Sequence, residues 1–191
     1  MSIKNIIVNG SELNTNRIAQ IKQFIKAIAA NSSINPQRVS SHLGDNRIVF
    51  CVTDSTRITD FGQFDSNSDI NERFKTNNPR FTASYHEIWN KVVVSKQDYR
   101  LKRIYFHLYL AEEDKEYILL HTDPTDDDIT HGRYKRSPHL HIKHSNDDII
   151  THAHLALNIN DYDLALSSLE EVNKCFRNHI DMLSHQILGI R

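Results

Sequence analysis

Cysteine and glycine are scarce in this sequence, and their scarcity excludes several kinds of protein. The two cysteines, Cys51 and Cys175, lack the spacing of a zinc finger or a redox pair, so we expect reduced thiols in a cytoplasmic protein. Five glycines are too few for a nucleotide-binding Rossmann unit. The sequence also has no glycine-rich phosphate loop and no nucleophile elbow, which argues against the standard nucleotide-binding and serine hydrolase motifs.

Net charge and long apolar runs are lacking as well. The 23 basic and 24 acidic side chains leave a formal charge of -1, so a nucleic-acid partner would need a local basic patch. No stretch approaches the roughly 20 apolar residues of a membrane span, and residues 1–10 lack the apolar core of a signal peptide. We therefore expect a cytoplasmic protein without a membrane partner, whose hydrophobic fraction of 39% supplies a core.

Histidine, by contrast, is abundant, and its placement suggests a site. Five of the 12 histidines fall within residues 138–155, and four of these five form two His-X-His pairs. The first pair is His139 with His141, and the second is His152 with His154. Each pair alternates with apolar residues, and a polar segment separates the two runs, which is the pattern of a β-hairpin.

The register of this hairpin decides whether the two pairs meet, because opposed residues share a face of the sheet. A turn centred on residues 146–147 places His141 opposite His152 and His139 opposite His154. We therefore expect one patch of four imidazoles on the outer, solvent-facing side of the sheet.

Two kinds of chemistry fit such a patch. All four histidines are candidate ligands of a divalent transition metal, with zinc favoured, because Zn–N bonds of about 2.0–2.1 Å bring several rings to one centre. Without a metal cofactor, two of the same imidazoles would serve as general acid and general base on a phosphodiester. A merely solvated sheet face, or a surface that contacts a protein, would show the same pattern.

Cationic and aromatic residues next to the histidines favour a phosphate-bearing substrate. Arg133, Arg136 and Lys143 would contact phosphate and stabilise developing negative charge, and Tyr134 would stack on a base. Lys143 alternates onto the face of the first His-X-His pair. A local basic site in a nearly neutral protein indicates nucleic acid, RNA before DNA, rather than a neutral metabolite.

The run Arg133-Tyr134-Lys135-Arg136-Ser137-Pro138-His139 resembles the Arg-Tyr-X-X-(Ser/Ala)-Pro-His element of the TumE-like toxins of prokaryotic toxin–antitoxin pairs. Lys135 and Arg136 stand where that family has Asp-Asn, and a second, Pro-His-His element is not found. The N-terminal half shows no correspondence. The resemblance implies a nucleic-acid-directed toxin, with Arg133, Tyr134 and His139 as the functional positions.

Other residues are weaker candidates. Asp123 and the acidic run 126–128 offer carboxylates to Mg²⁺, although a solvated turn fits consecutive acidic residues better. Tyr105, His107 and His121 would border the histidine patch if their strands align suitably, but the pattern does not fix that register.

Hydrophobic periodicity predicts an α+β protein in two parts. Residues 1–95 would form a β-α-β-like subdomain with a long irregular loop at 54–80. Residues 96–191 would form a four-stranded antiparallel meander packed by a long C-terminal helix that begins after Asn160. The expected helical segments are 14–30, 37–43, 69–75, the start of 81–94 and 161–188, and the expected strands are 3–8, 47–53, the end of 81–94, 101–110, 117–121 and the two arms of the hairpin.

We therefore hypothesise a nucleic-acid-directed phosphodiesterase, such as a ribonuclease-like toxin or an antiviral defence effector. The alternative is a non-catalytic accessory subunit of a bacterial defence or toxin system, in which the sheet face contacts a protein partner. The sequence does not indicate an oligomeric state.

Overall fold

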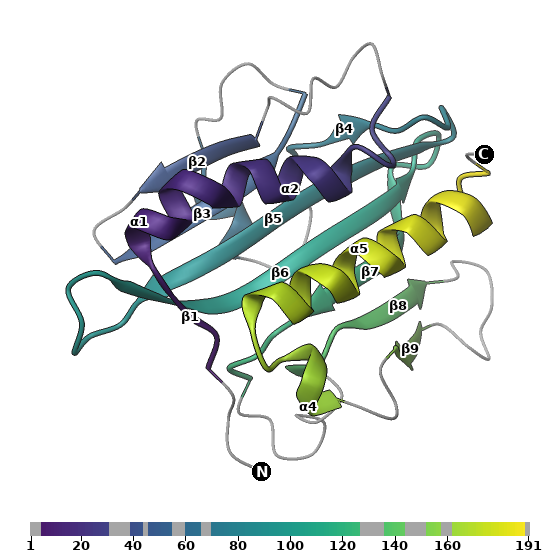
Figure 1. Cartoon of the computed structure of the whole chain (residues 1–191). Helices are drawn as coiled ribbons and strands as arrows, with labels where there is room; N and C mark the ends of the chain where they lie inside the picture. The colour runs from purple at the N-terminus through teal and green to yellow at the C-terminus, as the bar shows by residue number, and fades with distance from the viewer. Residues whose placement is uncertain are drawn as a thin grey trace.

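One antiparallel β-sheet organises the chain in the computed structural model (Figure 1). The residues that the structure describes are 5–30, 39–43, 46–54, 60–65, 70–126, 136–143, 152–157 and 162–189. The sheet order is β2-β3-β5-β6-β7-β8-β9, with β1 paired to β6 and β4 to β5. The strands are β1 (Ile7–Asn9), β2 (Val39–Leu43), β3 (Arg47–Val52), β4 (Phe74–Lys75), β5 (Phe81–Lys91), β6 (Asp98–Leu110), β7 (Lys115–Thr122), β8 (His139–Lys143) and β9 (His152–Ala156).

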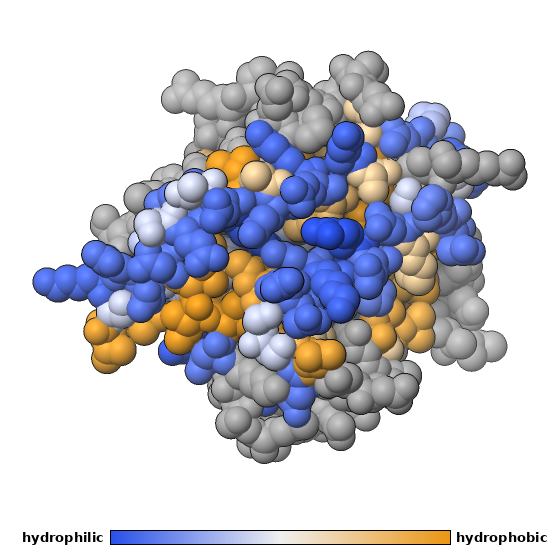
Figure 2. Space-filling view, in the orientation of Figure 1, coloured by the Kyte–Doolittle hydropathy of each residue, from blue (hydrophilic) through white to orange (hydrophobic). Residues whose placement is uncertain are grey.

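Helices cover one face of this sheet, as Figure 1 shows for α2 and α5. The helical elements are α1 (Gly10–Glu12), a π-helical turn (Leu13–Arg17), α2 (Ile18–Ile25), a 3-10 turn (Gly62–Asp65), α4 (Tyr162–Ala165) and α5 (Leu169–Gln186). Apolar side chains of α2 and α5 meet the apolar side chains of β3, β5, β6 and β7 in one large core. Figure 2 shows the same side of the molecule, where hydrophilic side chains cover much of the outer surface.

The fold class expected from the sequence is confirmed at the coarse level: the protein is α+β, with an antiparallel sheet and a C-terminal helix. The sheet is larger than the four strands expected, because nine strands are described. Strand β5 pairs with β6 from Phe81 opposite Leu110 to Lys91 opposite Tyr99. The residues on the two sides of the expected border near residue 95 therefore belong to one sheet.

The C-terminal helix begins later than expected. Ser168, not Asn160, caps α5, since its backbone is extended and its side chain accepts a hydrogen bond from the Glu171 backbone N–H. The Ser-X-X-Glu spacing is that of a capping box. The short α4 precedes this cap, so the single helix expected over 161–188 was wrong in its first part.

Three shorter expectations were also wrong. Residues 39–43 form β2 rather than a helical turn, and the described part of 69–75 contains β4 rather than a helix. Residues 81–91 are strand throughout, although we expected the segment 81–94 to begin as helix. Strand β5 is buried on both faces over most of its length, so its side chains do not alternate cleanly between apolar and polar.

The second face of the sheet carries histidines, and we call it the histidine face. Opposed residues share a face, and the pairing runs from His86 to Tyr105, from Tyr105 to His121 and from His121 to His139. The face that carries α2 and α5 is the helix face. At its β3 end, the histidine face also has a small apolar cluster of Val49, Cys51, Phe64, Ile70 and Ile88.

Candidate metal centre

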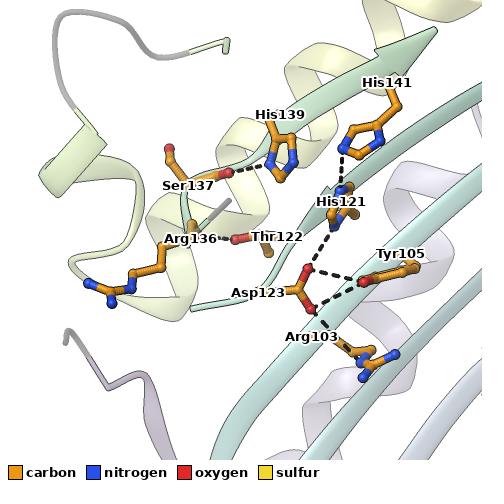
Figure 3. Close-up of polar contacts among 9 residues, drawn as sticks. All are labelled: Arg103, Tyr105, His121, Thr122, Asp123, Arg136, Ser137, His139 and His141. Carbon is orange, nitrogen blue, oxygen red and sulfur yellow. Dashed lines mark hydrogen bonds and ion pairs between the residues drawn. The ribbon is translucent and has the colours of Figure 1, made fainter. Parts of the chain in front are cut away.

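Three histidines of the histidine face converge at the β7–β8 pair. His121 lies directly opposite His139, and His141 is two residues further along β8. One ring nitrogen of each histidine lies within 4.8 Å of the others. Figure 3 shows the three rings gathered between the two strands, with Asp123 on the other side of His121. We call His121, His139 and His141 the histidine centre.

Hydrogen-bond acceptors fix the orientation of two of the three rings, those of His121 and His139, through their Nδ1 atoms. The Nδ1 of His121 lies 2.8 Å from the Asp123 carboxylate, and the Nδ1 of His139 lies 2.9 Å from the Ser137 carbonyl oxygen. Because a carboxylate and a carbonyl only accept hydrogen bonds, each Nδ1 carries the proton. In the neutral ring, each Nε2 then has its lone pair available as a ligand. Carboxylate and carbonyl partners of this kind accompany most metal-bound histidines.

His121 and His141 contact each other directly. Their Nε2 atoms are 2.8 Å apart, which is a hydrogen-bond distance. If the Nε2 of His121 has a lone pair, the Nε2 of His141 donates. Asp123, His121 and His141 therefore form a continuous hydrogen-bonded chain through which a single proton bridges the two imidazoles.

The histidine centre is buried, contrary to the expectation of an exposed patch. The exposed fractions are 5% for His121, 1% for His139 and 9% for His141. Burial removes the water that would otherwise satisfy a ring nitrogen, so each polar atom of this cluster needs a protein partner, a proton or an ion.

Asp123 connects the histidine centre to β6. Its carboxylate accepts hydrogen bonds from the Tyr105 hydroxyl at 3.1 and 3.3 Å, and the guanidinium of Arg103 lies 3.9 Å away. Burial and the Asp123 charge raise the pKa of Tyr105, so its hydroxyl stays protonated and remains a donor. Arg103 also lies over the Tyr105 ring, 5.2 Å from its centroid.

The row of rings continues across the sheet beyond Tyr105. His86 contacts Tyr105 and stacks on His107, with ring centroids 5.2 and 5.7 Å apart, and the Nδ1 of His107 lies 2.5 Å from Glu116. Burial, with smaller effects of His107 and Arg103, holds the pKa of His86 well below its usual value. His86 is therefore a neutral imidazole.

The structure brings together only part of the site expected from the sequence. Within the first His-X-His pair, His139 and His141 belong to the histidine centre. The expected hairpin register was wrong by two residues, because His141 pairs with His154, and His139 with Ala156. This register opposes Leu140 to Leu155 and thus apolar to apolar.

Other expected residues lie elsewhere or outside the described part. Position 152 pairs with position 143, but the side chains of Lys143, His152 and His154 are outside the described ones, as are residues 133 and 134. Arg136 donates from Nε to the Asp126 carbonyl at 2.6 Å, and its own carbonyl accepts from Thr122. Of the acidic run 126–128, only Asp126 is described.

Two residues of the centre were not identified as ligand and partner. His121 was expected only as a neighbour of the patch, and Asp123 only as a magnesium ligand. His121-Thr122-Asp123 has the same two-residue spacing as His-X-His, so both side chains lie on one face of the chain. This His-X-Asp pattern was the signal that could have found them.

Comparisons with known proteins found no relative of this chain. In the described residues, no helix is both long and apolar enough to cross a membrane. No protein-family model, no curated protein and no solved structure matches the chain.

Proposed function

We propose that the protein is a metal-dependent phosphodiesterase, in which His121, His139 and His141 hold a divalent transition metal ion. The observation that carries this proposal is the convergence of three buried ring nitrogens within 4.8 Å, two of the rings being held through Nδ1. Three histidines form a ligand set that leaves a further coordination position open. Zinc is the preferred ion, and copper, nickel and iron suit the same ligands.

The metal-free geometry must adjust slightly to accept zinc. Two nitrogen ligands of a tetrahedral zinc ion lie about 3.3 Å apart, given Zn–N bonds of about 2.0–2.1 Å. The Nε2 atoms of His121 and His141 are 2.8 Å apart. Metal binding would therefore replace the proton between these two rings and separate them by about half an ångström, a shift that side-chain torsions accommodate.

The chemistry that such an ion supplies is the activation of water and the polarisation of a phosphoryl oxygen. The protein's own groups have separate roles. Asp123 holds the orientation of His121 and strengthens it as a ligand, and Tyr105 holds Asp123. Arg103 supplies positive charge on the same side of the sheet, where it can contact a phosphate oxygen.

A metal-free phosphodiesterase is the second candidate, favoured by the chain Asp123–His121–His141. Its two hydrogen bonds, each 2.8 Å long, connect a carboxylate to two imidazoles in series. His141 would take up a proton while Asp123 stabilises the positive charge that develops on the pair. A role of this face as a protein-binding surface is less favoured, because His121, His139 and His141 are buried.

The decisive experiment measures metal binding and cleavage together. Chelator-treated protein is titrated with Zn²⁺ and Co²⁺ by calorimetry and absorption, and then assayed on RNA and DNA with and without the ion. We expect one ion per chain, metal-dependent cleavage, and the loss of both in His121→Ala and His141→Ala. At an ion concentration of 100 times Kd, the free energy of unfolding of the wild type should rise by about 2.7 kcal/mol.

The matched control is His185→Ala, because His185 is exposed on α5. It should bind the ion and cleave like the wild type. Cleavage that persists in chelator but disappears in His141→Ala would favour the metal-free candidate. Neither metal binding nor any cleavage that depends on these histidines would contradict both.

A further inference from the structure

A pocket of about 260 Å³ lies at one end of β5 and β6, away from the histidine centre. Among its described lining residues, three side chains are cationic and none is acidic. The lining residues are Asn90, Lys91, Val92, Val93, Val94, Arg100, Leu101, Lys102 and Thr125. A pocket lined by several cationic side chains attracts anions.

The backbone register explains why cations gather here. Asn90 pairs with Arg100, and Ile88 with Arg103, while a bulge shifts the register between Ile88 and Trp89. Ile88 faces the apolar cluster of the histidine face, so Arg100 and Arg103 lie on that face too. The bulge leaves Lys102 as the extra residue between them.

The charges around this pocket are incompletely compensated. Burial and the neighbouring Arg103 lower the pKa of Lys102, as expected where cations crowd together. Two carboxylates that act on Lys102, those of Asp65 and Asp123, are already engaged, Asp65 with Arg47 and Asp123 with His121.

Arg100 independently indicates that a hydrogen-bond acceptor is missing from this pocket. Its Nε–H is buried and has no hydrogen-bond partner in the part of the chain that the structure describes. A buried donor without a partner is costly, and a bound anion would satisfy it.

We propose that this pocket binds a phosphate group of the substrate other than the one that is cleaved. The inference rests on the proposed phosphodiesterase function, which it deepens by making the substrate a polymer with at least two phosphates. Lys102 and Tyr105 are three residues apart on β6, or about 10 Å. Thr125 of the pocket follows Asp123 closely in the chain, so the two sites share a segment.

The apolar rim of the pocket suits the rest of a nucleotide. Val93 and Val94 are 100% and 96% exposed, and Figure 2 shows hydrophobic surface at this end of the molecule. Apolar side chains beside a phosphate site provide a surface for the apolar part of a sugar or a base.

The test compares Arg100→Gln/Lys102→Gln with the matched control Lys22→Gln/Lys26→Gln, which removes the same charge from α2 and its C-cap. Binding of inorganic phosphate and of a short single-stranded oligonucleotide is measured in chelator, so that no metal is involved. We expect the pocket variant to lose at least about tenfold in affinity for both ligands, and the control to behave like the wild type. Thermal unfolding checks that each variant is folded.

Kinetics and metal binding separate this inference from the proposed function. The pocket variant should raise KM for the oligonucleotide while kcat and zinc affinity stay close to those of the wild type. Phosphate binding that the variant weakens, with oligonucleotide binding unaffected, would mean a site for free phosphate and would overturn the subsite. Unchanged binding of both ligands would show that this pocket binds neither phosphate nor the oligonucleotide. A chain that binds phosphate here but no metal at the histidine centre would contradict the proposed function alone.

Discussion

The two faces of the sheet each bury a polar cluster, and the clusters differ in how they are satisfied. On the helix face, Arg17 and Glu87 form an ion pair with two hydrogen bonds of 2.8 and 2.9 Å. Trp89 donates to the same carboxylate, and Arg17 also donates to Asn173 on α5. Opposite charges and complementary donors give the Glu87 carboxylate and the Nε and Nη1 groups of Arg17 protein partners, while Nη2 of Arg17 is buried without a hydrogen-bond partner among the described residues.

The histidine centre, by contrast, brings together three groups of the same kind. Imidazoles offer one another either a shared proton or converging lone pairs, and the His121–His141 contact shows the first arrangement. Converging lone pairs are what a cation requires. The comparison shows that burial of polar groups alone does not indicate a site. The useful distinction is between a cluster that pairs opposite charges and a cluster of like groups whose lone pairs an added ion would join.

The largest expected effect comes from breaking the helix-face cluster. Arg17→Met leaves the Glu87 carboxylate buried without its cation, which should lower the free energy of unfolding by about 3–5 kcal/mol. Urea unfolding measures the change, with Lys26→Met at the exposed C-cap of α2 as the control. The double variant Arg17→Met/Glu87→Leu should recover much of the loss. A single variant as stable as the wild type would show that the pair does not close this cluster.

A smaller effect is expected when the Asp123 carboxylate, which accepts a hydrogen bond from His121, is replaced. Asp123→Asn keeps the three candidate ligands but replaces the charge behind His121, so zinc affinity should fall about 10–100-fold. Calorimetric titration measures this affinity, and Asp181→Asn on α5 is the matched control. Equal affinities in the two variants would mean that Asp123 does not support the centre.

The smallest expected effect is on the acid dependence of the free energy of unfolding. The folded pKa of His86 lies well below the usual value of about 6.5 that it regains on unfolding. Below about pH 6.5 the unfolded chain therefore binds more protons at this position, and stability falls by up to about 1.4 kcal/mol per pH unit. Above that pH the contribution is constant.

His86→Leu should flatten this acid dependence, and denaturant unfolding at pH 7.5 and pH 5.5 measures the difference from the wild type. His185→Gln, on the exposed side of α5, should leave it unchanged. Curves of equal slope for His86→Leu and the wild type would show that His86 is not responsible.

Local patterns predicted strands in which the residue types alternate along the sequence, and they failed where a buried polar side chain interrupts that alternation. Strand β6 alternates clearly and was expected, whereas β5 carries Glu87 on one face and His86 on the other, each inside the protein. The polar side chains of β5 are explained by partners far away in the sequence, such as Arg17.

The candidate site was likewise predicted only in the part that depends on the pattern within one strand. His139 and His141 were recognised because they stand two residues apart on one strand. His121 became part of the centre only through the pairing of β7 with β8, and register between strands is a property of the whole sheet. Local sequence does not specify it.

The position of β8 in the sheet has a consequence for local unfolding. Among the described strands, only β9 lies beyond it, so His139 and His141 belong to a hairpin at the margin of the sheet, while His121 belongs to a strand nearer the middle. Marginal hairpins open more readily than central strands do. An ion held by all three histidines would cross-link this hairpin to the rest of the sheet, and its release would allow β8 and β9 to detach together while the other strands stay paired.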